Sequence, residues 1–463
     1  MSIFSWPASE VAAALNLPAP AGEEVVFPRV STDTRTLQAG DLFVALKGAR
    51  FDAHTMLSEA ASAGAAGAVV SHIPADAPRS LHYFVVADTL HALGALARHR
   101  RDRTAARVVG VVGSNGKTTT KDLLRAALSG TYEVHATQGN LNNQIGVPLT
   151  LLAAPEEAEV LVVEMGTNEP GEIAILSSIV RPDYVVVTSI GEEHLEKLGS
   201  LEGVLEEELS ALRGLGPEGM AFVAEEPEAL PRRAREILSP DRVRVAGVGP
   251  TAQLRPDGGA DGIEVLPDGT TRWSWRGHAV HLPIPGRFNV RNALLALGVA
   301  VELKVSEAEA VRGIGEVTSA RLRGEWQRIG SLRVLADCYN SNPPSVREAI
   351  ELLASLPAEG PKVAVLGTMR EMGVHTEALH RQVAERVLDR LGKGIDVVVA
   401  TGAFVAAFDG VAPGDGRIIR CIDPVEAYHA LAGRLNGDET ILLKASRGEA
   451  LERWLPLLRK EWE

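Results

Sequence analysis

A glycine-rich turn between an apolar run and a helix-forming stretch is the strongest chemical signal in the sequence. The run ARVVGVVG leads into SNGKTTT, and the turn consists of Gly113, Ser114, Asn115 and Gly116. Backbone amides in such a turn can converge on an anion at the N-terminus of a helix. Lys117 can reach the β- and γ-phosphates, and the Thr118 hydroxyl can ligate Mg²⁺. The pattern is a shortened nucleotide-binding loop, because Val111 replaces the usual first glycine, and it predicts ATP binding; the alternative is a turn that only caps a helix.

Two further side chains follow neighbouring apolar runs. Glu164 closes EVLVVEMG, and His194 follows YVVVTSIGEEH. Ligands of open α/β sheets bind at the carboxyl ends of the strands, and phosphate chemistry needs a metal held by oxygen ligands. We therefore expect Glu164 near the metal and His194 in an equivalent place. The alternatives are a surface carboxylate and a solvent-facing histidine.

The stretch HLEKLGSLEGVLEEEL predicts a helix that starts at Leu201 and is capped by Ser200. At about 100° per residue, Glu208 lies within roughly 20° of Leu201, inside the apolar stripe, and the two glutamates before it point away. The other members of the stripe are Val204, Leu205, Leu209 and Leu212. A carboxylate there is costly unless it is paired, so we expect a specific role. The alternative is a rim position or a pair with Arg213.

The elements around these residues predict three parts. A chain of 463 residues exceeds one core, and we expect an N-terminal domain at 1–100, a central nucleotide-binding domain at 101–313 and a C-terminal domain at 314–463. The fold class is α/β: a small α/β domain, a mostly parallel nucleotide-loop sheet with a β-hairpin insertion around PDG, and a Rossmann-like domain. Strand-like runs are DLFVALKG, GAAGAVV, HYFVVAD, ARVVGVVG, AEVLVVEMG, RPDYVVVTSIG, RVLADCY, KVAVLG, IDVVVATG and ETILLKAS.

Composition excludes several classes of protein. The net charge of −13 without a Lys/Arg cluster argues against a nucleic-acid surface. Apolar stretches are too short to span a bilayer, and the first residues lack the pattern of an export signal. Two cysteines form neither a disulfide framework nor a metal motif. We expect a cytoplasmic protein that acts as a monomer.

Ordered motifs along nearly the whole chain resemble those of the ATP-dependent Mur ligases. They are STDTR at 31–35, GDLFVALKG at 40–48, GSNGKTTTK at 113–121, GNLNNQIGVPLTLL at 139–152, EMGTNEPGEI at 164–173, GEEHLEKLGSLEG at 191–203, GRFNVRNALLAL at 286–297, DCYNSNPPS at 337–345, LGTMREMG at 366–373 and LLKASRGEALE at 442–452. GNLNNQIG, DCYNSNP and MREMG resemble the members that add D-alanyl-D-alanine to a UDP-N-acetylmuramoyl-tripeptide.

The resemblance implies a peptidoglycan-precursor ligase with a UDP-substrate-binding domain at 1–100, a central ATPase domain at 101–313 and a C-terminal ligase domain at 314–463. ATP would phosphorylate the terminal carboxylate of the UDP-linked tripeptide, the amine of D-alanyl-D-alanine would attack the acyl phosphate, and ADP and phosphate would be released. Catalysis would then consist mostly of aligning and neutralising two anions.

The resemblance also implies residue roles. Adenine would contact Asn292, ribose Asp337 and the γ-phosphate Arg323. The full set of implied ATP contacts is Gly113, Ser114, Asn115, Gly116, Lys117, Thr118, Thr119, Asn292, Arg323 and Asp337. Two Mg²⁺ ions would be held by Thr118, Glu164, His194 and Glu208. The implied catalytic residues are Lys117, His194, Glu208 and Arg323. Substrate contacts would be Ser31, Asp33, Arg35, Lys47, Asn140, Asn143, Asn340, Asn342, Lys444 and Arg447, although a solvated basic turn is the alternative for the last two.

Glu208 is also a departure from the family pattern. Most relatives have a carboxylated lysine fourteen residues after the histidine, and here that position is Glu208. Glutamate is a permanent carboxylate, but its chain is roughly 3.5 to 4 Å shorter. We expect Glu208 to replace the carbamate electrostatically. Further departures are Ser189, Phe288, Thr368 and Ala445.

Two other functions fit parts of the pattern. One is a ligase of the same fold that adds the third peptide residue or polymerises glutamate on folate. The other is a non-ligase kinase or regulatory nucleotide-binding protein, which leaves the third part unexplained. Because Arg323 and Asp337 belong to the third part and Lys117 to the second, we expect closure of the two parts to assemble the site.

Overall fold

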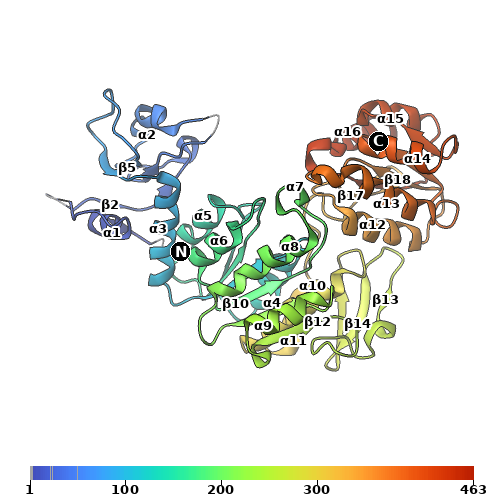
Figure 1. Ribbon diagram of the computed structural model, residues 1–463, viewed down its shortest axis with the longest axis horizontal. Coiled ribbons are helices and arrows are strands. Elements are labelled where there is room, and N and C mark those ends of the chain that lie inside the picture. The colour runs from blue at the N-terminus through green and yellow to red at the C-terminus, as the bar shows by residue number, and fades with distance from the viewer. Residues whose placement is uncertain (1–3, 21, 23, 49–50) are drawn as a thin grey trace.

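The computed structural model describes residues 4–20, 22, 24–48 and 51–463. Figure 1 shows three lobes in chain order, with the N-terminal and C-terminal lobes at opposite ends and the central lobe between them. All three contain parallel sheets covered by helices, so the predicted three-part α/β fold class is confirmed.

The N-terminal lobe contains a four-stranded parallel sheet in the order β3-β4-β5-β6 and a small antiparallel pair, β1-β2. The three runs predicted as strands here form β4, β5 and β6. The elements are β1 (Trp6–Pro7), α1 (Ala8–Ala14), β2 (Val26–Phe27), β3 (Val30–Ser31), β4 (Leu42–Val44), α2 (Leu57–Ser62), β5 (Gly67–Val70), β6 (His82–Val85) and α3 (Thr89–Arg103).

The central lobe is built on six parallel strands in the order β12-β11-β10-β7-β9-β8. The apolar runs predicted as buried strands form β7, β9 and β10, which pack between two helical layers. The elements are β7 (Arg107–Val112), α4 (Lys117–Leu128), β8 (Val134–Ala136), α5 (Gly146–Leu152), β9 (Val160–Glu164), α6 (Glu172–Val180), β10 (Tyr184–Val187), α7 (Leu195–Leu198), α8 (Leu201–Leu209), β11 (Met220–Ala224), α9 (Ala229–Ile237), β12 (Val243–Ala246), α10 (Asn289–Glu302) and α11 (Glu307–Ile314).

An antiparallel insertion follows β12. The predicted hairpin at PDG is present, since it joins β13 (Glu264–Val265) to β14 (Thr271–Trp275). A third strand, β15 (His278–Leu282), pairs along the other side of β14, so the insertion is a three-stranded sheet rather than a hairpin alone. Alternate residues of β14 are buried, including Trp273 and Trp275, which pack into the cluster shared with α4 and α10.

The C-terminal lobe contains a six-stranded sheet in the order β16-β17-β21-β18-β19-β20. The four predicted strands are β17, β18, β19 and β21, and the structure adds β16, which runs antiparallel to β17, and β20 at the other edge. The elements are β16 (Glu325–Ile329), β17 (Leu332–Asp337), α12 (Pro343–Ser355), β18 (Lys362–Leu366), α13 (Thr376–Leu388), β19 (Val397–Ala400), α14 (Ala403–Val411), β20 (Ile418–Arg420), α15 (Pro424–Ala432), β21 (Thr440–Lys444) and α16 (Trp454–Trp462).

The two predicted domain boundaries stay predictions. Residue 100 lies within α3, which packs against α5 and α6 of the central lobe, and residue 313 lies in the last turn of α11. In the part of the chain that the structure describes, no helix combines the length and the apolar character needed to cross a membrane.

Candidate active site

The carboxyl ends of β7, β9 and β10 meet at one edge of the central sheet. β7 lies between β9 and β10 in this parallel sheet, so the strand order reverses there, which is where open α/β sheets form ligand crevices. The chain leaves β7 through Gly113 and Gly116, with φ angles of +120° and +84°, and α4 begins at Lys117. Both glycines adopt conformations that other residues rarely tolerate.

Half of the amides expected to bind phosphate already have acceptors. Gly113 N–H donates to Glu208 Oε2 at 2.8 Å, and the Ser114 and Asn115 amides donate to the backbone oxygen and hydroxyl of Ser189 at 2.9 and 2.8 Å. In the described chain, the amides from Gly116 to Thr119 have no acceptor. The expected phosphate contacts of the Gly113, Ser114 and Asn115 amides therefore stay a prediction. The amides without an acceptor lie at the start of α4, where a helix N-terminus can bind an anion.

The Lys117 ammonium is held inside the site. Its Nζ donates to the Gly113 carbonyl and lies 3.9 Å from Glu193 Oε1. Burial alone would lower the pKa of Lys117, but the nearby carboxylates of Glu193, Glu208 and Glu164 outweigh it and raise that pKa above its usual value. Lys117 is therefore a permanent cation in an acidic surrounding.

Two buried carboxylates near Lys117 carry oxygens without hydrogen-bond partners. Glu164 Oε1 accepts a bond from Asn142 Nδ2 at 2.9 Å, whereas Glu164 Oε2 and both oxygens of Glu193 have no partner among the described residues. Burial raises the pKa of Glu193, and the charges of Lys117 and His194 oppose that rise. Carboxylate oxygens that accept no hydrogen bond are available as ligands, and they are the ligand type that Mg²⁺ prefers.

The protein does not form a complete metal cage. Within residues 4–20, 22, 24–48 and 51–463, no group of three or more His, Cys, Asp or Glu side chains could hold a metal ion. Mg²⁺ commonly binds through one or two carboxylates together with substrate phosphates and waters. The free oxygens of Glu164 and Glu193 and the hydroxyl of Thr118 fit that second arrangement.

His194 lies at the boundary between the central and C-terminal lobes. It adopts a φ of 49° at the start of α7, and its Nδ1 lies 2.5 Å from Glu371 Oε2. Its Nε2 lies 3.8 Å from Glu193 Oε2. Burial would lower the pKa of His194, but the hydrogen bond to Glu371 and the charge of Glu193 raise it.

The C-terminal lobe contributes a second set of charged groups. Asp337 and Lys444 are directly paired at the ends of β17 and β21, and Lys444 Nζ lies 3.0 Å from Asp337 Oδ2 and 2.7 Å from the Asn340 carbonyl. The Arg323 guanidinium lies 4.0 Å from the centre of the Tyr339 ring. Lys444 is buried, so the alternative of a solvated basic turn is excluded for this residue.

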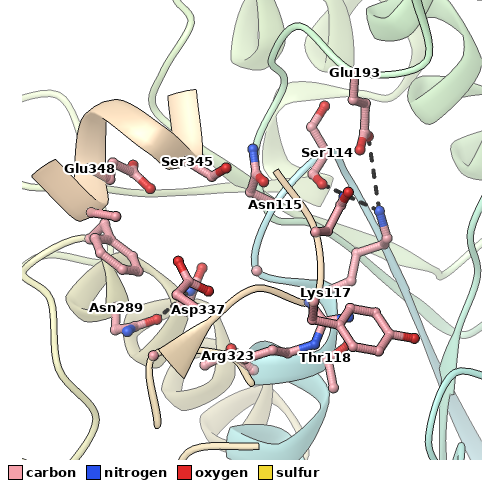
Figure 2. A pocket seen from close by; sticks show the side chains of 18 of the residues that line it. Ser114, Asn115, Lys117, Thr118, Glu193, Asn289, Arg323, Asp337, Ser345 and Glu348 are labelled. Atoms are coloured by element: carbon pink, nitrogen blue, oxygen red, sulfur yellow. Dashed lines mark hydrogen bonds and ion pairs between the residues drawn. The ribbon is translucent and has the colours of Figure 1, made fainter. Parts of the chain in front are cut away.

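One cavity of about 300 Å³ brings these groups together. In Figure 2, Lys117 and Glu193 point toward each other, and Arg323 and Asp337 enter the same space from the C-terminal lobe. The predicted site residues that line the cavity are Ser114, Asn115, Gly116, Lys117, Thr118, Thr119, Glu164, His194, Asn292, Arg323, Asp337, Asn340 and Lys444. The expectation that Lys117, Glu164 and His194 share one cavity is confirmed.

Other predicted residues lie elsewhere. Glu208 is fully buried behind the loop, pairs with Gly113 and not with Arg213, and does not line the cavity. Asn342 caps α12 and donates from Nδ2 to Asn115 Oδ1 at 3.0 Å, so it contacts the glycine-rich loop without lining the cavity. Arg447 is exposed and pairs with Glu452 at 2.9 Å.

The predicted substrate residues of the N-terminal half gather partly around a second cavity, of about 330 Å³. Ser31 and Asp33 line it, whereas Arg35 is exposed beside Asp33 and Lys47 pairs with Asp52 at 3.5 Å. Asn143 Oδ1 accepts the amides of residues 145 and 146 at the start of α5, and Asn140 is exposed.

The segment 138–142 connects the two cavities. Gln138 and Leu141 line the second cavity, and Asn142 lines the first. A long substrate could therefore contact the N-terminal lobe and the charged centre at the same time.

Comparison with known protein families gives two matches. Residues 111–300 match the Mur ligase middle domain, and residues 322–447 match the Mur ligase glutamate ligase domain. The chain belongs to the Mur ligase family. A UDP-N-acetylmuramoyl-tripeptide--D-alanyl-D-alanine ligase of Bacillus subtilis is 35% identical over 94% of this chain and 93% of the relative.

Solved structures of Mur ligases share the arrangement of lobes. The MurF crystal structure from Acinetobacter baumannii has a TM-score of 0.87 and 30% identity, with 99% of this chain and all of that chain covered. MurF of Thermotoga maritima in complex with ADP has a TM-score of 0.80 and 27% identity, with 94% of this chain and 97% of that chain covered. This Mur ligase therefore has the fold of ATP-dependent, ADP-forming amide ligases.

Sequence reasoning missed several groups of this Mur ligase site. Glu193 directly precedes His194, and the paired carboxylates of GEEH were an available signal. Glu207, expected to point away from the stripe, is buried and accepts hydrogen bonds from the Gly171 and Ile173 amides at the start of α6. Asn142 and Glu371 are visible only through their tertiary contacts with Glu164 and His194.

Proposed function

We propose that this chain joins D-alanyl-D-alanine to the tripeptide of a UDP-N-acetylmuramoyl-tripeptide, with ATP converted to ADP and phosphate, during peptidoglycan precursor synthesis in the cytoplasm. One observation carries the proposal: Lys117 and the loop at the start of α4 share a cavity with Arg323, Asp337 and Lys444 of the other lobe. A site made by two sheet edges can hold a nucleotide and an acceptor carboxylate together. The expected monomeric state remains a prediction.

The charges of the site support carboxylate activation. In the first step the terminal carboxylate of the tripeptide attacks the γ-phosphorus, the bond to the bridging oxygen breaks, and ADP leaves. Both reactants are anions, so positive groups must offset their repulsion. Lys117 would contact the β- and γ-phosphates, and the Arg323 fork would suit the transferred phosphoryl group.

The second step forms the amide bond. The amine of the dipeptide attacks the acyl carbon, and the tetrahedral intermediate expels phosphate while the amine loses a proton. The cavity supports this step because groups from both lobes surround it, which holds the two reactants close and oriented.

The residues present fit Mg²⁺. Thr118 and Glu164 would hold one ion and His194 together with Glu193 a second, because all four residues line the cavity, and Glu164 Oε2 and both Glu193 oxygens accept no hydrogen bond in the described chain. When bound, the ions would neutralise phosphate charge.

The tripeptide carrier is expected to extend from the second cavity to the first. Ser31 and Asp33 would contact its uridine end in the N-terminal lobe, and segment 138–142 would guide the peptide toward Glu164 and Lys117. This placement would leave the peptide terminus near the γ-phosphate.

A substrate-omission assay tests the proposal. The purified protein is incubated with ATP, Mg²⁺, UDP-N-acetylmuramoyl-tripeptide and D-alanyl-D-alanine, and phosphate release is followed. We expect release to require both the tripeptide and the dipeptide, and L-alanyl-L-alanine to serve as the matched control that supports little turnover. Release that needs only ATP and one acceptor carboxylate, or that responds to folate and glutamate instead, would contradict the proposal and favour the other functions.

A further inference from the structure

Helix α8 carries two adjacent buried carboxylates that face different parts of the nucleotide site. Glu207 is 7% exposed and Glu208 is 0% exposed. Neighbouring residues in a helix point about 100° apart, so the two side chains reach different neighbours. Buried carboxylates are retained only where they are hydrogen-bonded or paired, so each of them should have a defined partner.

Glu208 holds the first residue of the phosphate loop. Its Oε2 accepts the Gly113 N–H at 2.8 Å, and its Oε1 has no hydrogen-bond partner in the described chain. A Cβ atom at Gly113 would clash with the Thr188 hydroxyl and lie 2.9 Å from the Ser189 backbone, so the loop packs closely against these residues. The Gly113 N–H points to Glu208, which does not line the cavity.

The same glycine holds Lys117. The Gly113 carbonyl accepts a hydrogen bond from Lys117 Nζ, so one residue is anchored by Glu208 through its N–H and anchors Lys117 through its C=O. A shift of Gly113 would move both the loop backbone and the phosphate-facing ammonium. Glu208 can therefore affect nucleotide binding without touching the nucleotide.

Glu207 holds the segment that joins β9 to α6. Its Oε2 accepts the Gly171 N–H at 2.7 Å, and its Oε1 accepts the Ile173 N–H at 2.8 Å, so it satisfies amides at the start of α6. It also accepts a bond from the Thr167 hydroxyl at 3.3 Å. The segment held in this way follows Glu164, and Thr167 lines the cavity.

We propose that Glu207 and Glu208 form an α8 brace that sets the separation of the phosphate loop from the segment after Glu164, with Glu208 acting as a positioning residue through Gly113. This role replaces the metal ligation that the sequence predicted for Glu208. It rests on the proposed nucleotide site but not on the identity of the acceptor substrate. Because the hydrogen bond to Gly113 needs an acceptor oxygen and not a charge, glutamine can preserve it and alanine cannot.

ADP binding in the absence of metal distinguishes a positioning role of Glu208 from a role as a metal ligand. ADP binding is measured by calorimetry in EDTA for the wild type, E208Q, E208D, E208A and the control E202A, whose side chain lies exposed on the same helix. The brace predicts an ADP dissociation constant within about threefold of wild type for E208Q and E202A. It predicts about tenfold weaker binding for E208A, from loss of the hydrogen bond that holds the Gly113 amide. E208D should resemble E208A, because its carboxylate is too short to reach Gly113.

Several results would overturn the proposal. One is that E208A binds ADP in EDTA as tightly as the wild type and binds more weakly only when Mg²⁺ is present. Another is that E208D binds ADP as tightly as the wild type while E208Q binds it weakly, which would show that the negative charge, and not the acceptor oxygen, is required. If E208A does not fold, the comparison of E208Q with E208D still decides. If the substrate-omission assay shows no amide-ligase activity but the ADP dissociation constants of the variants follow the predicted order, the proposed reaction is refuted and the role of Glu207 and Glu208 is not.

Discussion

Nδ1 of His194 lies 2.5 Å from Oε2 of Glu371, and this ion pair joins the central lobe to the C-terminal lobe. Both residues have positive φ angles, 49° and 64°, so the backbone of each is held in an uncommon conformation at the contact. The Glu196 amide also donates to the Glu371 carbonyl at 3.1 Å. A movement of the C-terminal lobe would therefore change the contact between Glu371 and His194, the predicted metal ligand.

Removal of this ion pair should loosen the contact between the lobes. Glu371→Ala should destabilise the contact between the two lobes by about 1 kcal/mol or less, because the Glu371 side chain is 56% exposed and solvent screens the pair. Small-angle X-ray scattering should show a larger mean radius of gyration for this variant. Glu377→Ala is the control, since Glu377 pairs with Arg381 inside the C-terminal lobe. Identical scattering of the wild type and both variants would show that the ion pair between His194 and Glu371 does not hold the lobes together.

Loss of the Lys117 charge should remove most activity. Lys117→Met should lower kcat by about 100-fold or more, because a preorganised cation facing the transferred phosphate is lost. Arg125→Met on the exposed side of the same helix should leave kcat nearly unchanged. Steady-state phosphate release measures both, and a Lys117 variant within a few-fold of wild type would show that the ammonium does not face the reacting phosphate.

Arg323 should not be replaceable by lysine. Its guanidinium stacks at 4.0 Å on the Tyr339 ring and lines the shared cavity, and a lysine offers neither the planar fork nor the stacking. We expect Arg323→Lys to lower kcat by about tenfold or more, by analogy with other arginine clamps on phosphoryl groups. The exposed neighbour Arg321, changed to lysine, is the matched control. Equal rates for the two variants would remove Arg323 from the reaction.

Gly116 should tolerate no side chain. A Cβ at this position would lie 2.7 Å from Asn292 Oδ1, and the φ of +84° is strained for other residues. Gly116→Ala should raise the KM for ATP by about tenfold or more, since the free amides of the loop must shift. Gly414→Ala shares the positive φ but meets no atom within 4 Å, so it should cost only about 1 kcal/mol of stability and leave KM unchanged. Equal KM values would argue against this loop as the ATP contact.

His380 should make the protein less stable in acid. Its Nε2 accepts the Met369 N–H at 2.9 Å, its Nδ1 lies 2.7 Å from the Thr376 carbonyl, and burial lowers its pKa below the usual 6.5. A lowered pKa means that the folded protein favours neutral imidazole. The contribution of His380 is therefore complete above about pH 6.5 and is lost as the pH falls below that value, when the unfolded chain takes up the proton.

Urea unfolding at several pH values measures this effect. Between pH 7 and pH 5 the wild type should lose more free energy of unfolding than His380→Gln, whose side chain does not titrate. Parallel loss in both proteins would show that other groups cause the acid sensitivity; His135, whose pKa burial also lowers, is the first of these to test.

Strong local patterns made most of the fold predictable. The apolar runs before Gly113 and Glu164 are buried strands with few alternatives, and the ends of these strands place both residues at one edge. The edge strands β16 and β20 gave weaker signals, because β16 is partly exposed and β20 has three residues. The third strand of the insertion, β15, was likewise not predicted, because its assignment depends on its pairing with β14 in the folded protein.

Site residues that directly follow a predicted strand could be placed from the sequence. Residues whose position depends on contacts with distant parts of the chain could not. The helical wheel placed Glu208 inside the protein correctly but could not show that its partner is the Gly113 amide. It placed Glu207 away from the apolar stripe but could not show its burial, because the segment that covers it, including Gly171, is distant in the sequence. Glu371 belongs to another lobe, so only the folded chain brings it to His194.

The most direct test of the central claim follows oxygen atoms through the reaction. The tripeptide substrate is prepared with a heavy oxygen isotope in its terminal carboxylate, and the phosphate released during turnover with D-alanyl-D-alanine is examined by mass spectrometry. If the shared cavity activates that carboxylate as an acyl phosphate, a labelled oxygen appears in the released phosphate. Phosphate that carries no label from the substrate would contradict the account.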